Sequence, residues 1–278
     1  MSILNRIDNR PLSSRVALRW TNWQTGLVLF FLIAPLLAII PLSFNSSAYF
    51  SYPMTGFSLR WYEKALLSPE WQRALLNSMG IGIVSTVIAT VLGTLAALGL
   101  SRPNFPLRSL IMPLLISPII IPVVVVAVGF YLVFAPLGLN DTYLGVVLSH
   151  AALGTPFVVI TVNASLLSFD RNLVRAAASL GATPWTAFRR VTLPVISPAV
   201  AAGAIFAFAT SFDEVIVILF IGGPDQNTIP REMWSGMRDS IDPSILAVAS
   251  LLTVFAIALF GAIHWLRGRT TGSSSSGV

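Results

Sequence analysis

Residues 175–194 read RAAASLGATPWTAFRRVTLP and form a polar, basic stretch between two long apolar runs. Just before this stretch, Asp170 is suited to cap a helix whose first turn is Arg171–Val174. The alanine-rich run that follows favours a helix, and Gly181 is suited to the left-handed residue that ends it. A helix of about ten residues is marginal alone in water, so this one needs a surface to dock on.

The second half of the stretch carries a second set of helix signals. Thr183 followed by Pro184 predicts a cap and a first helical residue. This helix is expected to run to about Val191 and to end at Pro194, because proline cannot continue the backbone hydrogen bonds. The sequence therefore predicts two short helices joined at an angle by a glycine turn.

The rest of the chain predicts an all-α integral membrane protein. Of its 278 residues, 55% are hydrophobic and only 10% are charged, whereas soluble domains carry about 25% charged residues. Only helices satisfy their own backbone in lipid, and each of six apolar runs reaches the ~20 residues that cross a bilayer. These six predicted transmembrane helices are Thr25–Phe44, Ala74–Leu100, Leu110–Phe134, Leu144–Ser165, Val195–Ile221 and Ser244–Leu266. Kinks or close packing are indicated by Gly80, Gly82 and Gly93 in the second run and by Pro113, Pro118 and Pro122 in the third.

The distribution of Lys and Arg predicts the orientation. With six spans, twelve of the 17 basic residues fall on the two termini and the two loops that share a side with them. That side is cytoplasmic by the positive-inside rule, which places both termini in the cytoplasm. The same asymmetry explains the net charge of +6 without nucleic-acid binding. The expected organisation is a cytoplasmic tail (1–24), a transmembrane domain (25–266) with a cytoplasmic loop (166–194), and a flexible tail (267–278).

The stretch 175–194 resembles the cytoplasmic coupling loop, or EAA loop, of bacterial ABC importer permeases. That motif reads Glu-Ala-Ala, two residues, Leu-Gly-Ala, and then a hydrophobic residue with Leu-Pro some ten residues on. The matching residues are Ala176, Ala177, Leu180, Gly181, Ala182, Phe188, Val191, Leu193 and Pro194. Arg175 departs from the motif, because the family usually has glutamate there, so a salt bridge from that position to the ATPase is not carried over. The helix–glycine–helix shape does carry over, and we name residues 170–194 the coupling segment.

Two further stretches, His150–Asp170 and Ser211–Pro243, look like the spermidine/putrescine branch of these permeases. The resemblance implies a type I importer bundle in the bacterial inner membrane and a polyamine as the first expected cargo. It also implies four kinds of partner: a second, similar permease that makes a heterodimer, two ATPase subunits, a periplasmic substrate-binding protein, and membrane lipid. ATP closure of the ATPases would act on the coupling segment, through Arg175 and the matching residues. An amphipathic loop lying on the membrane surface is the alternative, since it accounts for Trp185 and the arginines.

The chain itself lacks the phosphate-binding GKT or GKS sequence, so it is not expected to be an enzyme, and no cofactor is implied. No metal site is expected either, because there are two histidines and no cysteine. His150 is interpreted as a hydrogen-bonded structural residue. A short outer helix is expected from Thr228 to Met237, with Met233 and Trp234 on one side.

Two acids, Asp213 and Glu214, lie inside the predicted fifth span. A carboxylate at the bilayer centre costs roughly 2.5–3.5 kcal/mol, so such residues usually have a function. We interpret Ser211, Phe212, Asp213 and Glu214 as candidates to line a path for a cationic solute, although Phe212 also suits simple packing. The alternative is that the acids reach water at the outer mouth, or that one of them pairs with an arginine of the following loop, Arg231 or Arg238.

Two other functions remain open at this stage. A secondary transporter or channel would use Asp213 or Glu214 for ion coupling. An ABC importer permease for another solute, such as an amino-acid-like compound, an opine or another small organic molecule, would share the same coupling segment. The residues alone do not distinguish either of these functions from polyamine import.

Overall fold

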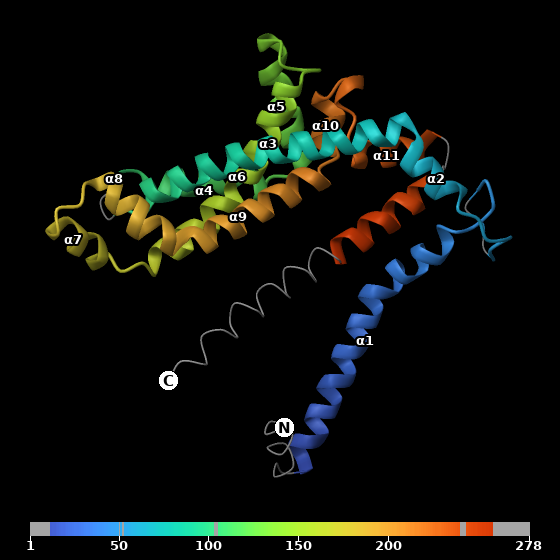
Figure 1. The fold of residues 1–278 in the computed structure, drawn as a ribbon, viewed down its shortest axis with the longest axis horizontal. Coiled ribbons are helices and arrows are strands. Elements are labelled where there is room, and N and C mark those ends of the chain that lie inside the picture. Colours follow the sequence, from blue (N-terminus) through green and yellow to red (C-terminus); the bar gives the residue numbers. More distant parts are fainter. Residues whose placement is uncertain (1–11, 50, 52, 103–104, 240–242, 258–278) are drawn as a thin grey trace. The chain divides into compact units, whose positions relative to one another are not determined.

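The computed structural model describes residues 12–49, 51, 53–102, 105–239 and 243–257, most of them helical (Figure 1). The chain divides into two units. Ser68–Asp239 forms the larger unit, and the residues on either side of it form the smaller one.

The larger unit contains the coupling segment and three long helices. Two of these begin at side-chain caps, where Ser68 accepts a hydrogen bond from Trp71 N and Thr142 accepts one from Gly145 N. Its helices are α3 (Pro69–Leu100), α4 (Arg108–Ile120), α5 (Val123–Phe134), α6 (Tyr143–Leu167), α7 (Asn172–Ser179), α8 (Pro184–Ala187), α9 (Leu193–Asp213), α10 (Ile216–Ile221) and α11 (Ile229–Asp239). A π-helical turn, Phe188–Thr192, lies between α8 and α9, and two 3₁₀ turns occupy Ala135–Leu137 and Pro224–Gln226.

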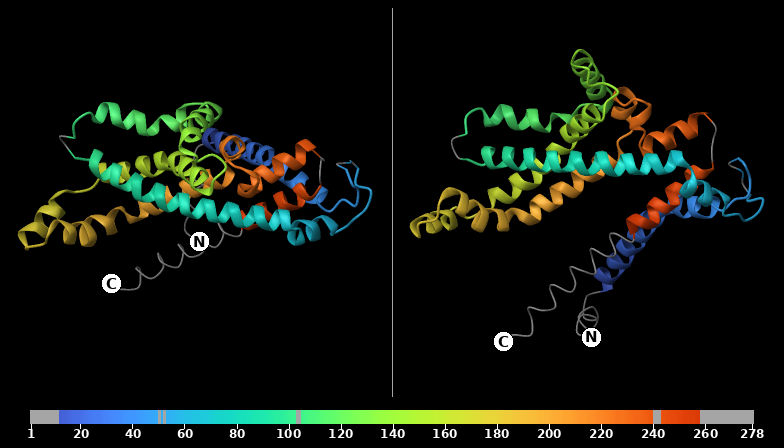
Figure 2. Two further views of the ribbon diagram at one scale, coloured as in Figure 1. Left: turned by 90° about the horizontal axis from the view of Figure 1, so that it is seen from above. Right: turned by 45° about the horizontal axis from the view of Figure 1, so that its top comes forward.

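Helices α3, α6 and α9 pack along one another and form the frame of this unit (Figure 2). Glycines allow their close approach. A Cβ at Gly93 of α3 would lie 2.7 Å from Val158 Cβ of α6, and one at Gly203 of α9 would lie 2.9 Å from Val158 Cα. Such contacts are tighter than side chains normally tolerate, so α6 is held between two glycine faces, as small residues allow in membrane bundles. The prediction of close packing at Gly93 is confirmed, whereas Gly80 has open space around it.

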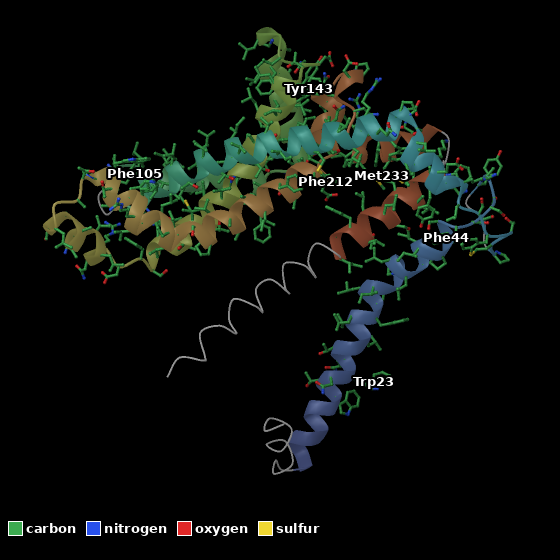
Figure 3. All side chains as sticks on the ribbon, viewed as in Figure 1. Trp23, Phe44, Phe105, Tyr143, Phe212 and Met233 are labelled. Carbon is green, nitrogen blue, oxygen red and sulfur yellow. The ribbon has the colours of Figure 1, made fainter. Side chains whose placement is uncertain are left out.

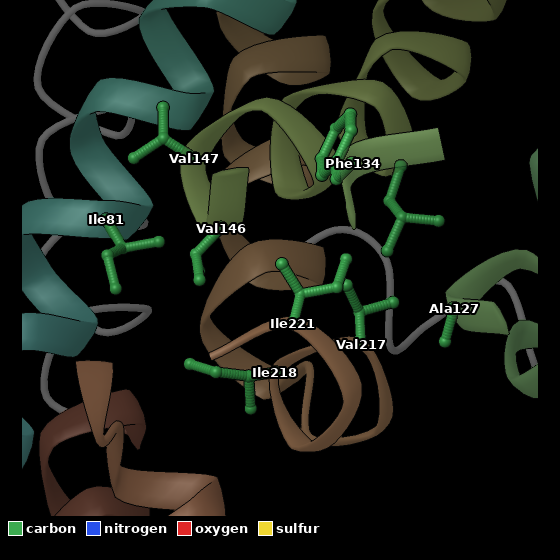
Figure 4. Close-up of a cluster of buried hydrophobic side chains, with 9 residues drawn as sticks. Ile81, Ala127, Phe134, Val146, Val147, Val217, Ile218 and Ile221 are labelled. Atoms are coloured by element: carbon green, nitrogen blue, oxygen red, sulfur yellow. The ribbon is translucent and has the colours of Figure 1, made fainter. Parts of the chain in front are cut away.

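A second buried cluster joins α3, α5, α6 and α10 (Figure 4). Val217, Ile218 and Ile221 of α10 are fully buried, and they pack with Ile81 of α3 and Val146 of α6. This cluster fixes α10 as a separate helix beside the frame.

The predicted third span is not one straight helix. α4 and α5 are bent by 108° at Ile121–Pro122. Ile121 has extended backbone angles (φ −75°, ψ 136°), which is what a residue before proline prefers. The prediction of a kink among the prolines is confirmed, and Leu110–Phe134 counts as one span only if the two bent helices are taken together.

The predicted fifth span, Val195–Ile221, is wrong in its bounds. The helix that overlaps it starts at Pro184 and ends at Asp213, and the last residues of the predicted span form the separate helix α10. In contrast, the first, second and fourth predicted spans correspond to the apolar helices Trp20–Leu42, Pro69–Leu100 and Tyr143–Leu167.

The smaller unit contains α1 (Leu12–Leu42), α2 (Arg60–Leu67) and a shorter apolar helix, Ser244–Ile257. The described residues hold four helices long and apolar enough to cross a membrane, or five if α4 and α5 count as one span. The predicted sixth span matches Ser244–Ile257 at its start, and its remainder lies outside the described residues.

A turn organised by Asn45 links α1 to α2. The Asn45 side chain donates to Ser51 O (3.0 Å) and accepts from Thr55 N (3.2 Å), while its carbonyl accepts from Trp61 Nε1 (2.9 Å). The ring of Phe44 stacks on that of Phe57, with centroids 5.0 Å apart. Asn45 therefore holds together Ser51, Thr55 and Trp61 of this turn.

Candidate functional site

The first helix of the coupling segment forms and ends as predicted. Asp170 Oδ1 accepts from Asn172 N (2.9 Å) at the start of α7, which begins at Asn172. Gly181 has φ +82°, the left-handed region. Its N–H donates to Ala178 O (2.9 Å), and Ala182 N donates to Ala177 O (3.0 Å). This pair of bonds is a Schellman motif, which turns the chain sharply after α7.

The second helix begins as predicted but does not end at Pro194. The Thr183 side chain accepts from Thr186 N (3.3 Å), and Pro184 is the first residue of α8. At the π-helical turn, Leu193 N donates to Phe188 O, one residue further back than in an α-helix. This wider turn accommodates Pro194, which lacks an N–H and would otherwise crowd the preceding turn. The helix therefore continues without a break from Pro184 to Asp213, over 30 residues.

The coupling segment presents apolar side chains to its surroundings. Leu180 is 89% exposed and Trp185 is 68% exposed. The ring centroids of Trp185 and Phe188 lie 5.6 Å apart. Two exposed apolar side chains on a short, capped turn are typical of a docking surface, because exposure of large apolar groups to water is unfavourable.

The other predicted coupling residues differ in how exposed their side chains are. Ala177, Ala182, Phe188 and Leu193 are half-buried, whereas Arg175, Ala176 and Pro194 are exposed. Ala187 and Thr192 are buried and fix the second helix against the rest of the unit. Arg171 donates to Ser101 O at the end of α3, which ties the start of α7 to that helix.

The chain breaks at the second predicted site, between α9 and α10. Glu214 has extended backbone angles (φ −77°, ψ 118°), and its Oε1 accepts from Val217 N (2.8 Å) in the first turn of α10. Asp213 is the last residue of α9, and it is exposed. A carboxylate is disfavoured there by the partial negative charge of the helix C-terminus. The two acids thus differ: Glu214 caps a helix, and Asp213 adds charge to an electronegative end.

Ser211 and Phe212 are held by neighbouring side chains. His150 Nδ1 and Ser211 Oγ lie 2.8 Å apart, and both side chains are buried. This confirms His150 as a hydrogen-bonded structural histidine. The Phe212 ring stacks on Phe208 one turn earlier, with centroids 5.7 Å apart, near the end of α9 (Figure 3).

Sequence reasoning missed a group of hydrogen bonds that fixes the loop 222–228. Asn77 Nδ2 donates to Asp225 O (2.7 Å) and Asn227 O (2.8 Å), and the Tyr143 hydroxyl donates to Asp225 O (2.9 Å) and Asn77 Oδ1 (3.0 Å). The only signal in the sequence is a polar Asn77 near the start of an apolar run.

Arg231 belongs to the same loop contacts. Its Nη1 donates to Gly222 O (2.9 Å) and Gly223 O (2.6 Å). Burial lowers the pKa of Arg231, and the neighbouring Asp141 and Glu232 oppose that shift. The acidic groups that act on Arg231 are therefore Asp141 and Glu232 rather than Asp213 or Glu214, and the alternative that one of these two acids pairs with Arg238 stays a prediction. The predicted outer helix from Thr228 to Met237 exists as α11.

The fold and these sites define a multi-pass helical membrane protein with a capped, exposed segment between two packed spans. Residues 89–272 match the family described as the binding-protein-dependent transport system inner membrane component. The chain belongs to this family, whose members are permease subunits of the inner membrane.

Relatives of known function agree with this assignment. The chain is 31% identical over 245 residues to the spermidine/putrescine transport system permease protein PotC of Escherichia coli strain K12, covering 88% of this chain and 92% of that one. It is 32% identical over 242 residues to the putrescine transport system permease protein PotI of the same organism, covering 84% and 85%. The molybdenum transport system permease protein ModB of Mycobacterium bovis is 31% identical over 226 residues, covering 74% and 85%.

Solved structures share the fold. A bacterial ABC transporter involved in the import of the acidic polysaccharide alginate superposes with a TM-score of 0.71 at 16% identity, over 92% of this chain and 98% of that one. The alginate transporter in complex with its pentasaccharide-bound periplasmic protein gives a TM-score of 0.70 at 19% identity, over 95% and 98%. The chain is thus an ABC importer permease of the PotC and PotI type, and a secondary transporter or channel is not supported.

Proposed function

We propose that the coupling segment docks in a groove of a separate ATPase subunit and passes the ATP-driven motion into the membrane. The observation that carries this is the continuity of the helix Pro184–Asp213. Its first turns present Trp185 outward, and its last residue is Asp213. At ~1.5 Å per residue it is roughly 45 Å long, so a displacement at one end can reach the other with no non-helical break between them.

Leu180 and Trp185 supply the contact with the ATPase. Both are exposed and apolar, and the capped turns on either side fix their positions. Arg175, Ala176 and Ala177 lie on the same segment, where the small alanines leave room for close approach. A loop that only rests on lipid has no need of the Schellman turn at Gly181, which argues against the membrane-surface alternative.

Cysteine crosslinking tests this docking, because the chain has no cysteine of its own. Leu180→Cys and Trp185→Cys are expected to crosslink to the co-expressed ATPase subunit. Leu107→Cys is the matched control, since Leu107 is an exposed leucine outside the coupling segment. Equal crosslinking of Leu107→Cys, or crosslinks of Leu180→Cys to lipid alone, would refute the proposal.

The proposed cargo is a polyamine such as spermidine or putrescine. PotC and PotI, which the chain resembles over most of its length, carry these solutes in their names. An exposed carboxylate at the C-terminal end of α9 supports a cation near Asp213, because the helix dipole and the carboxylate attract positive charge together. ModB is nearly as similar in identity, so the cargo rests on Asp213 as well as on the relatives.

The same proposal includes the other subunits of the importer and the orientation of this chain in the membrane. A second, similar permease pairs with this chain as a heterodimer, two ATPase subunits bind below, and a periplasmic protein delivers the solute. Both termini lie in the cytoplasm, with the transmembrane domain at 25–266 between the tails 1–24 and 267–278. Tagging each terminus and testing its accessibility in sealed, inside-out vesicles checks the orientation.

A further inference from the structure

A cavity of about 510 Å³ lies beside the coupling segment in the larger unit. Four elements line it: the end of α3, the end of α6, α7 and the π-helical turn. The charged side chains of its lining are Arg102, Arg171 and Arg175, and no carboxylate of the described residues lines it.

The positive charge of this cavity is not balanced by the described residues around it. Arg171 donates to Ser101 O at the C-terminal end of α3, where the helix carries a partial negative charge. The nearby Asp170 uses Oδ1 to cap α7. Arg102 and Arg175 remain, and both are exposed residues of the cavity lining. An anion bound in the cavity offsets the repulsion between the like charges that line it.

Part of the cavity lining is apolar and includes Leu166, Phe169 and Phe188. It lies at the ends of two apolar helices that run to Leu100 and Leu167. Basic pockets between transmembrane helices at headgroup level suit anionic phospholipids. A guanidinium matches the oxygens of a phosphodiester, and an acyl chain fits the apolar wall, whereas a soluble anion uses only the charges.

We propose that this cavity binds the phosphodiester headgroup of an anionic phospholipid through Arg102 and Arg175. The bound lipid bridges α3 and α6 on one side to α7 and the π-helical turn on the other. It therefore holds the coupling segment in its docking position. Only this last consequence rests on the proposed function; the binding itself does not.

Lipid binding to the full-length chain tests the proposal. Native mass spectrometry of the purified chain measures the retention of phosphatidylglycerol against phosphatidylcholine from mixed vesicles. Arg102→Gln and Arg175→Gln are each expected to weaken phosphatidylglycerol binding roughly fivefold, the usual effect of one basic residue at an anionic surface. Arg190→Gln is the matched control: it is an exposed arginine of the same segment outside the cavity lining, and its effect is expected to stay within about twofold.

Two outcomes would overturn the proposal. Unchanged phosphatidylglycerol retention in Arg102→Gln and Arg175→Gln is the first. The second is displacement by inorganic phosphate with no preference between the two lipids, which would make the occupant a soluble anion. Arg102→Lys, which keeps the charge, covers the case in which Arg102→Gln does not fold, and it is expected to lose less binding than Arg175→Gln. The chain alone suffices for this measurement, so a failure of ATPase docking leaves its result unaffected.

Discussion

The two ends of the helix Pro184–Asp213 differ in their capping, their exposed apolar surface and their charge. At its N-terminal end, caps satisfy the backbone and apolar Trp185 is left exposed. At its C-terminal end, exposed Asp213 adds a charge that the helix dipole disfavours. The first end leaves an apolar surface exposed, and the second end places a negative charge where the helix dipole disfavours it. We call the first the docking end, after the proposed ATPase contact, and the second the ion-attracting end, after the proposed cation site.

The largest effect is expected from a charge placed at Leu180, at the end of α7 and just before the docking end. Leu180→Asp puts a carboxylate on a side chain that is 89% exposed, so the fold is unaffected. If Leu180 is buried on docking, the loss is at least that of a central interface residue, about 2 kcal/mol, or roughly thirtyfold in ATPase association and in uptake. Pull-down of the ATPase and uptake in proteoliposomes measure both.

Leu107→Asp is the control for this variant. Leu107 is likewise exposed and lies at the start of α4 with φ +57°, where Asp is accommodated better than Leu. Its uptake is expected to stay within about twofold of the unaltered chain. Normal uptake in Leu180→Asp would contradict the comparison, because the exposed apolar surface of the coupling segment would then not be needed for docking.

The next largest effect concerns the ion-attracting end. Asp213→Asn removes the charge and keeps the shape, and the KM for spermidine is expected to rise roughly tenfold, from the loss of one charge–charge attraction. Glu214→Gln leaves an amide oxygen that still accepts from Val217 N, so its KM is expected to change by no more than about twofold. Initial uptake rates over a range of spermidine concentrations give both values. Equal changes of KM in the two variants would mean that Asp213 and Glu214 do not have the different roles that their geometry suggests.

The coupling segment was largely predictable from sequence, and the far end was not. Asp170, Gly181 and Thr183 act on the residues next to them, so their roles follow from local rules. The passage through Pro194 depends on a π-helical turn, which a local proline rule does not foresee. The break at Glu214 has no glycine or proline signal. It depends on the burial of α10 against α3, α5 and α6, which are distant in sequence.

The difference between local rules and contacts distant in sequence also explains which transmembrane spans were predicted correctly. Hydropathy located three of the predicted spans within a few residues, because length and composition decide them. It treated Leu110–Phe134 as one span, because the 108° bend at Pro122 changes no residue's hydropathy. The contacts of Asn77 with a loop some 150 residues later were beyond any local pattern.

A substitution in the middle of the helix tests how closely the segment between its two ends packs on α6. Gly203→Ala places a Cβ 2.6 Å from Thr161 Oγ1 and 2.9 Å from Val158 Cα. Because the second atom is backbone, α9 must shift from α6, at a cost of about 1–3 kcal/mol. The melting temperature of the purified chain is expected to fall, and uptake with it. Gly80→Ala is the control, since its Cβ meets open space and alanine favours the helix. A Gly203→Ala chain as stable as Gly80→Ala would mean that α6 and α9 do not pack as closely as described.

The most local effect is expected in the loop 222–228, which follows the ion-attracting end. Asn77→Ala removes the donor to two carbonyls, Asp225 O and Asn227 O, whereas Tyr143→Phe removes a hydroxyl that reaches Asp225 O and Asn77. At about 1 kcal/mol for each bond lost, hydrogen exchange of the loop amides is expected to quicken roughly tenfold or more in Asn77→Ala and less in Tyr143→Phe. Exchange in the coupling segment is expected to stay unchanged, because the contacts that fix Gly181 and Thr183 are local. Faster exchange in both the loop 222–228 and the coupling segment of Asn77→Ala would show that the two regions do not depend on separate contacts. That result would refute the contrast between the two ends of the helix.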